Sequence, residues 1–317
     1  MTQVAVIIPA HNAAATVGRA VRAALAEPEA IEVIVVDDAS VDETATTAHA
    51  ADDGSGRLKI LTEPRNAGPS AARNRAIRES VAPWIAVLDA DDFFRPGRLK
   101  NLLAYADKAD LIADDAGRVD VAGIEGPCQS LLGETLAAPR AVSFAEFVTS
   151  NVTDRKRPRG EMGFLKPLMR RGFLAAHSLN YREDLRLGED YELYARALAQ
   201  GARFLLAPGQ GYVSVMRADS LSGNHTPEDL RRLRDCDAAL TRMPGLTDAD
   251  KAALRRHYLS VDGRLQWRLL IEAVKARDPY AAALAFLRPY PVPFYVLARL
   301  AEQMILRGAK KLKGQSR

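Results

Sequence analysis

Runs of consecutive apolar residues alternate with helical periodicity along the first third of the chain. The runs predict buried strands at residues 4–8, 31–36, 58–61 and 84–88. Between the first two runs, Val17, Val21 and Leu25 recur at helical spacing and stop before Pro28, which predicts a helix. Strands that alternate with helices in this way form parallel sheets with right-handed crossovers. The pattern therefore predicts an α/β fold with a doubly wound, mainly parallel sheet.

Polar residues and prolines indicate where the next helices begin. The segment 40–43 has the spacing of a capping box, which predicts that a second helix starts at Ser40. Ser70 follows a turn and is placed to cap a third helix, which contains Arg73. A fourth helix is expected after Pro96.

The pattern changes twice after residue 107. Loops and short strands are expected at 114–163, followed by a helix at 189–199 and strands at 203–206 and 212–215. Beyond a boundary at 222–227 the chain is mostly helical, and Thr247 is placed to cap the longest helix. We therefore expect a domain at 1–222, with halves at 1–107 and 108–222, and a helical region at 223–317.

Composition limits the class of protein. The 317 residues are 48% apolar and carry a net charge of +4, as in an ordinary globular protein and unlike a nucleic-acid binder. Cys128 and Cys236 lie in no metal-binding spacing, so two reduced thiols are expected. The N-terminus shows no signal peptide, and no stretch reaches the roughly 20 apolar residues of a membrane span. We expect a cytoplasmic protein.

Three carboxylates follow the fourth predicted strand, at Asp89, Asp91 and Asp92. They lie at the carboxyl end of the strand, where open α/β sheets bind ligands. Acids this close repel one another, which makes a divalent cation their natural partner. Capping of the next helix is the alternative, but one cap requires one acid. The cluster therefore favours a divalent metal that holds an anionic ligand.

Polar residues at other strand ends belong to the same edge of the predicted sheet. His11 follows the first strand and Asp38 the second, where Asp38 could accept from a nucleobase or a ribose hydroxyl. Arg73 could pair with phosphate. Taken alone, each of these residues is explained as a helix cap or a surface ion pair. Their common position at one edge of the predicted sheet favours a nucleotide-binding site instead. Neither G-x-G-x-x-G nor G-x-x-x-x-G-K-[ST] is present, which argues against a dinucleotide enzyme or an NTPase.

Four segments in series resemble the inverting family-2 glycosyltransferases in order and spacing. They are 8–12 (IPAHN), 36–40 (VDDAS), 66–74 (NAGPSAARN) and 88–92 (LDADD). The resemblance is strongest over 1–107 and extends to about 222. It implies the GT-A fold, a nucleoside-diphosphate sugar as the donor, a nucleotide-sugar-binding half at 1–107 and an acceptor half at 108–222.

The resemblance also implies roles for individual residues. The residues implied in donor binding are Pro9, His11, Asp38, Arg73, Asp89 and Arg217. Asp91 matches the last acid of the family's DxD motif and is implied to bind a divalent cation, Mn²⁺ or Mg²⁺, at the diphosphate. The segment 188–193 (GEDYEL) resembles the family's ED motif, which gives Asp190 the role of the catalytic base. The alternative for Asp190 is an acid favoured by the helix dipole in a first turn.

Other basic and aromatic residues receive no catalytic role from the sequence. Lys166, Arg170 and Arg171 could touch an anionic acceptor or lie on the surface, and they are left out of the expected site. The Q-x-x-R-W signature of processive synthases is absent, because Gln266 and Trp267 are adjacent here. Addition of a single sugar is therefore expected.

The last predicted helix, 294–313, is amphipathic. Leu297, Leu300, Met304 and Ile305 lie toward one face, and after Glu302 the charged residues are all basic. Two interpretations stay open. The helix packs on the protein as a tail, or it lies on the inner membrane with its basic residues toward anionic lipid.

The sequence as a whole predicts a metal-dependent inverting glycosyltransferase. We expect it to move a sugar, with UDP-glucose as the default donor, to a hydroxyl of a glycan or lipid-linked glycan in exopolysaccharide assembly. A sugar-phosphate nucleotidyltransferase is an alternative, although residues 9–13 lack the glycine-rich basic loop that it needs. A non-catalytic sugar-nucleotide-binding scaffold is the other alternative.

Overall fold

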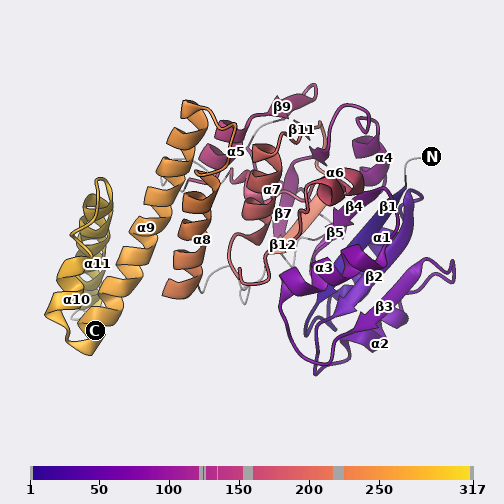
Figure 1. Cartoon of the computed structure of the whole chain (residues 1–317). Helices are drawn as coiled ribbons and strands as arrows, with labels where there is room; N and C mark the ends of the chain where they lie inside the picture. Colours follow the sequence, from indigo (N-terminus) through magenta and orange to yellow (C-terminus); the bar gives the residue numbers. More distant parts are fainter. Residues whose placement is uncertain are drawn as a thin grey trace.

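The computed structural model describes residues 3–120, 124, 126–133, 135–152, 160–216 and 225–314, with side chains up to residue 306. Figure 1 shows the chain running from an N-terminal α/β layer at one end to a group of C-terminal helices at the other. The central part, which contains α5 (Phe144–Ser150) and α7 (Glu189–Ala199), lies between them.

The main sheet has eight strands and is parallel in its first half. Its spatial order is β3 (Leu58–Thr62), β2 (Ala30–Asp37), β1 (Val4–Ala10), β4 (Trp84–Val87), β10 (Leu168–Arg170), β6 (Leu111–Ala113), β11 (Phe204–Leu206) and β9 (Arg140–Val142). The strands β3, β2, β1 and β4 are parallel, as the alternation predicted. The strand β10 runs antiparallel to both of its neighbours, so the second half of the sheet is mixed.

A second, smaller sheet packs beside the first. Its order is β5 (Phe93–Phe94), β12 (Tyr212–Met216), β7 (Ala116–Asp120) and β8 (Gln129–Ser130). The strand β5 follows the acidic turn after β4 directly, so this sheet fixes one side of that turn.

The N-terminal helices cover the parallel strands, but two of them start at other residues than predicted. They are α1 (Val17–Leu25), α2 (Thr44–His49), α3 (Pro69–Glu79) and α4 (Arg98–Leu103). Ser40 does not cap α2, because its hydroxyl accepts a hydrogen bond from the Asn12 amide at 2.9 Å and joins two loops. Ser70 lies inside α3, which starts at Pro69 since proline has no amide hydrogen to leave unpaired there.

The short helix α6 (Arg171–Ala176) follows β10 and was not predicted. The C-terminal region is helical, as predicted, with α8 (Pro227–Leu240), α9 (Asp248–Ala276), α10 (Pro279–Leu284) and α11 (Val292–Gly314). Thr247 forms the predicted cap of α9, as part of a capping box with Asp250. Leu233 and Leu254 belong to the same buried apolar cluster as the main sheet, and the division at residue 222 stays a prediction. None of the described helices is long and apolar enough to cross a bilayer.

Candidate active site

Two acidic segments and one arginine meet at the carboxyl end of β4. Arg73 of α3 donates to Oδ1 of Asp89 at 2.9 Å and to Oε1 of Glu189 at 2.8 Å. The same guanidinium lies 3.8 Å from Oδ1 of Asp190, in the first turn of α7. The structure therefore brings Arg73, Asp89 and Asp190 together, although about a hundred residues separate the two acidic segments.

Lys166 completes this cluster, although it was left out of the site expected from the sequence. Its ammonium group donates to Oδ2 of Asp190 at 2.6 Å and lies 3.0 Å from Oδ2 of Asp89. The side chain is buried, so these two carboxylates are its immediate surroundings. Five charged side chains thus form one network, in which Lys166 and Arg73 lie between Asp89 after β4 and the two acids Glu189 and Asp190 of α7.

The backbone around Lys166 is held by buried contacts on both sides. Its carbonyl oxygen accepts a 2.6 Å hydrogen bond from Arg98, which is itself paired with Asp114. On the other side, the short helix η2 (Met162–Phe164) approaches α7 closely at Gly163. A Cβ at Gly163 would lie 2.5 Å from Oδ1 of Asn151, so only glycine fits there. These contacts fix the position of the ammonium group between the two acids.

The electrostatics of the cluster keep its members charged. Burial opposes ionisation of Asp89, but the charges of Lys166 and Arg73 outweigh it and hold its pKa well below the ordinary range. Burial likewise opposes the charge on Lys166, and the carboxylates of Asp190 and Asp89 raise its pKa above the ordinary value. Asp89 is therefore engaged by two protein cations.

Asp92 is a structural residue of the acidic turn. Its carboxylate accepts hydrogen bonds from the Tyr212 hydroxyl at 2.7 Å and from the Val215 amide at 2.9 Å, both on β12. Burial and the nearby carboxylates of Asp89 and Asp91 raise the pKa of Asp92 to about 7. These contacts join the acidic turn to the second sheet. Asp92 therefore supports the turn and does not cap the helix that follows it.

Asp91 occupies the outer part of the same turn. Its carbonyl oxygen accepts a hydrogen bond of 2.6 Å from Arg19, which anchors the backbone of the turn to α1. Over the described residues, no group of three or more histidine, cysteine or acidic side chains is arranged to hold a metal ion. A magnesium or manganese ion bound through one or two carboxylates and the phosphates of a nucleotide needs no such group. The donor set available here suits that mode of binding.

The loops after β1 and β2 form the other side of the site. The carboxylate of Asp38 accepts from the amides of Ala67 at 2.8 Å and Gly68 at 2.7 Å, and so orients the turn before α3. His11 donates from Nδ1 to the Asp38 carbonyl at 2.8 Å, since that oxygen can only accept. Pro9 lies within β1, in register with Val36. His11, Asp38 and the turn before α3 therefore meet, as predicted.

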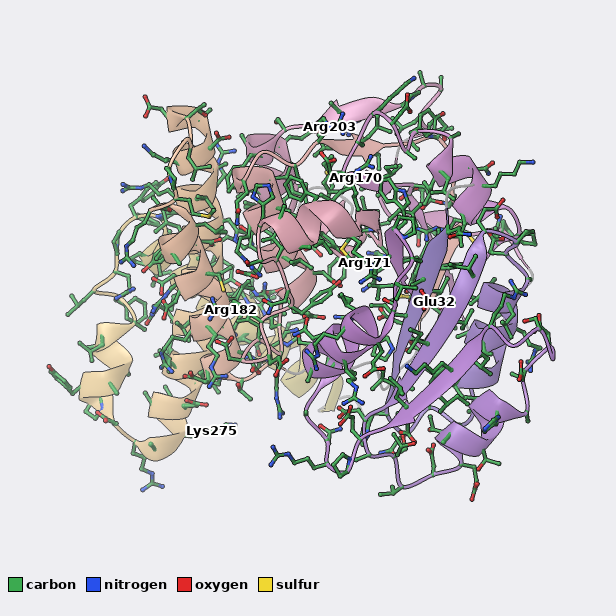
Figure 2. The ribbon with its side chains drawn as sticks, turned by 45° about the vertical axis from the view of Figure 1, so that its right-hand side comes forward. Glu32, Arg170, Arg171, Arg182, Arg203 and Lys275 are labelled. Atoms are coloured by element: carbon green, nitrogen blue, oxygen red, sulfur yellow. The ribbon has the colours of Figure 1, made fainter. Side chains whose placement is uncertain are left out.

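Two other basic residues named from the sequence, Arg170 and Arg171, do not join this cluster. Arg170 pairs with Asp110, which it shares with Arg203, and Arg171 donates to the carbonyl oxygen of Ala82 (Figure 2). Both Arg170 and Arg171 thus support the fold rather than face an acceptor. Arg217 lies outside the described residues, and its role stays a prediction.

Comparisons with known proteins agree with this geometry. Residues 5–132 match the model of glycosyl transferase family 2. The chain is 47% identical to the succinoglycan biosynthesis protein ExoU of Rhizobium meliloti over 92% of its own length and 84% of that protein. It is 38% identical to ExoO of the same organism, over 82% of this chain and 70% of that protein.

Solved structures show the same fold at low sequence identity. S. aureus TarS 1-349 in complex with UDP-GlcNAc superposes with a TM-score of 0.65 at 18% identity, over 88% of this chain and 89% of the TarS 1-349 chain. The mannosyltransferase PcManGT of Pyrobaculum calidifontis, in complex with GDP-Man and Mn²⁺, gives a TM-score of 0.57 at 18% identity, over 95% and 87%. The family match, the relatives and the fold agree, and the chain therefore belongs to glycosyl transferase family 2 and is a glycosyltransferase with the GT-A fold.

Proposed function

We propose that this glycosyltransferase transfers a sugar from a nucleoside-diphosphate donor, with a UDP-sugar as the expected donor, to a hydroxyl of a glycan or lipid-linked glycan. The observation that carries the proposal is the convergence of Arg73, Asp89 and Asp190 at the sheet edge. ExoU and ExoO are named for succinoglycan biosynthesis, which supports exopolysaccharide assembly as the setting. TarS was solved with UDP-GlcNAc, which supports a UDP-sugar; UDP-glucose is the default for the first test.

In this proposal Asp190 acts on the acceptor, and other residues of the site bind the donor. Asp190 takes the proton of the acceptor hydroxyl as that oxygen attacks the anomeric carbon, and the nucleoside diphosphate leaves from the opposite face. Arg73 and Lys166 orient the Asp190 carboxylate. Pro9 of β1, with His11 and Asp38 of the loops after β1 and β2, surrounds the nucleotide base.

Asp91 is the protein ligand that we propose for a divalent cation. Asp91 matches the last acid of the family's DxD motif, in the turn whose other acids contact Lys166, Arg73 and β12. When bound, Mn²⁺ or Mg²⁺ offsets the charge that develops on the leaving diphosphate. PcManGT was solved with Mn²⁺, which supports testing this ion first.

Membership of this glycosyltransferase family removes both the nucleotidyltransferase and the non-catalytic scaffold as alternatives. We propose that the protein acts in the cytoplasm, with residues 1–222 as the catalytic unit. The decisive experiment is a thermal-shift screen of nucleotide sugars with and without Mn²⁺, followed by an assay of nucleotide release with an acceptor. A ligand of the native state raises the unfolding temperature, so the nucleotide sugar that gives the largest shift is the candidate donor. No shift with any nucleotide sugar would refute the donor assignment, and a shift without nucleotide release would refute the proposed acceptor.

A further inference from the structure

Helix α11 has two apolar faces, and only one of them is packed. Val292 and Val296 are both buried, and Val296 forms a small cluster with Leu270 of α9 and Ala285. The opposite face carries large apolar side chains that are between 51% and 71% exposed, namely Phe294, Leu297, Met304 and Ile305. Positions 294, 297, 301, 304 and 305 recur at helical spacing, so they form one stripe along the helix.

The helix α10 and the loop that follows it also expose large apolar side chains. They are Tyr280, Leu284, Leu287 and Tyr290, and the ring of Tyr290 lies 5.6 Å from that of Phe294 on the stripe. We call these residues, together with the stripe on α11, the outer apolar face. Soluble monomers rarely expose so many large apolar side chains in one region, and such a region marks a contact with a protein or a membrane.

The part of the sequence that carries the outer apolar face is strongly basic. Residues 275–317 contain nine lysine and arginine residues against two acids, whereas the whole chain has 44 against 40. The positive charge of the protein is therefore concentrated in its last 43 residues. Apolar side chains beside an excess of basic residues are the combination that binds anionic lipid surfaces.

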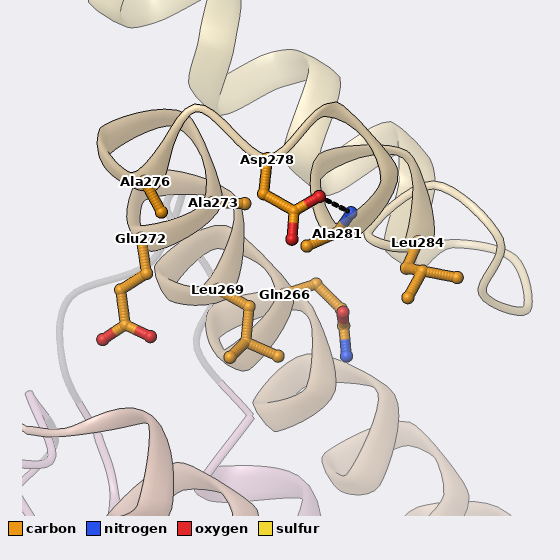
Figure 3. Close-up of a pocket in the computed structure, with 8 residues that line it drawn as sticks. All are labelled: Gln266, Leu269, Glu272, Ala273, Ala276, Asp278, Ala281 and Leu284. Carbon is orange, nitrogen blue, oxygen red and sulfur yellow. Dashed lines mark hydrogen bonds between the residues drawn. The ribbon is translucent and has the colours of Figure 1, made fainter.

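A groove of about 330 Å³ lies between α9 and α10, close to the outer apolar face (Figure 3). Its lining does not suit an anionic lipid. Leu269, Ala273 and Leu284 line it, together with the acids Glu272 and Asp278. Carboxylates repel phosphate, so an anionic head group would not be attracted into the groove. The contact with lipid is accordingly assigned to α11, α10 and the loop between them.

We propose that the outer apolar face binds the interface of a bilayer that contains anionic lipid, with α11 lying in the plane of the membrane. A second copy of the chain is disfavoured as the partner, because it would bring two basic ends together. Figure 1 shows α10 and α11 at the end of the molecule far from β1–β3, so the membrane would lie on the side of the helical region. Delivery of a lipid-linked acceptor to Asp190 would follow from this orientation and rests on the proposed function, whereas lipid binding does not.

The experiment is co-flotation of the full-length protein with vesicles. One set contains phosphatidylcholine alone and the other about 30% phosphatidylglycerol, since anionic lipid supplies the attraction. We expect flotation with the anionic vesicles, a decrease in about 0.5 M NaCl, and weak flotation with the neutral set. The double variant L297E/I305E is expected to lower the bound fraction by at least about tenfold, because two charges enter the apolar stripe.

The matched control is Val81→Glu, which places a charge on an apolar residue that is 79% exposed and far from α11 in the sequence. It should float like the unchanged protein. The thermal shift with UDP-sugar is measured on the same samples, so that loss of lipid binding is distinguished from failure of the donor site. Equal flotation of L297E/I305E and the unchanged protein would overturn the proposal. A dimer in solution that L297E/I305E dissociates would also overturn it, in favour of a second copy.

Discussion

Lys166 donates a 2.6 Å hydrogen bond to Oδ2 of Asp190, the carboxylate proposed as the base. Both side chains are buried, and Asp89 lies on the other side of the ammonium group at 3.0 Å. The ammonium group fixes the direction of both carboxylates, and its charge lowers the pKa of Asp89 against the effect of burial. The pair therefore connects the acceptor half of the site to the acidic turn after β4.

Replacement of Lys166 tests what this pair does. In K166M the carboxylates lose a cation, so kcat/KM at neutral pH should fall by about 10- to 100-fold and the acid limb of its pH profile should move to higher pH. K166R keeps the charge and should restore the position of the limb. An unchanged profile in K166M, with only lower activity, would assign Lys166 a structural role.

Asp190→Asn tests the base directly. The amide cannot accept the proton of the hydroxyl, so transfer should fall by roughly 10²–10⁴-fold while the thermal shift with the donor is kept. The matched control is Asp248→Asn, an exposed acid in the first turn of α9. If both variants transfer at the rate of the unchanged protein, Asp190 is only an acid favoured by the helix dipole.

Asp91→Asn tests the metal assignment. The amide is a weaker ligand for a divalent ion, so the Mn²⁺ concentration needed for half-maximal activity should rise by about tenfold or more. A chelator should abolish transfer by the unchanged protein, and added Mn²⁺ or Mg²⁺ should restore it. Asp107→Asn, at an exposed acid, serves as the control. An unaltered Mn²⁺ dependence in D91N would place the metal on other residues.

Tyr212→Phe tests the support of the acidic turn. The hydroxyl donates to Asp92 at 2.7 Å and accepts from the Asp89 amide at 3.3 Å, so its removal leaves two buried groups with one partner fewer. We expect a loss of about 1–3 kcal/mol in the free energy of unfolding, measured by denaturant titration. Tyr280→Phe, at a tyrosine that is 75% exposed, should change it little. Equal effects of the two variants would reject the supporting role.

Elements that depend on local interactions were predicted from the sequence, whereas contacts between distant residues were not. The strands β1 to β4 were predicted because apolar runs and helical spacing are local, and parallel strands then bring Asp38 and Asp89 to one edge. Lys166 was left out because its partners lie 24 and 77 residues away, and it follows an irregular segment without periodicity. Ser40 failed as a cap for the same reason, since its hydrogen bond to Asn12 spans 28 residues.

The outcome for α11 shows a different limit. The sequence identified an amphipathic helix, but Leu300 belongs with the packed side of α11 and not with the exposed stripe. When a helix has two apolar faces, its sequence pattern alone does not say which of them is buried. Only the position of α9 decides which face is buried.

The two thiols give a prediction about the junction of α7 and α8. Cys236 lies in α8, and burial raises its pKa to about 12, so at pH 8 only on the order of 10⁻⁴ of it is thiolate. Cys128 is partly exposed and accessible to reagent. A thiol reagent should therefore titrate one cysteine in the native protein and two after unfolding.

The slow reaction of Cys236 in the variant C128S should then report on opening of α8. The neighbouring Asp237 accepts a hydrogen bond of 2.7 Å from the hydroxyl of Tyr191, which follows Asp190 in α7. Loss of this bond in Y191F should weaken the junction and speed the labelling of Cys236, by about tenfold for a loss of about 1.4 kcal/mol. Labelling of Cys236 in C128S as fast as that of Cys128 in the unchanged protein would show that α8 opens freely, and the helix that carries Asp190 would then lack this support.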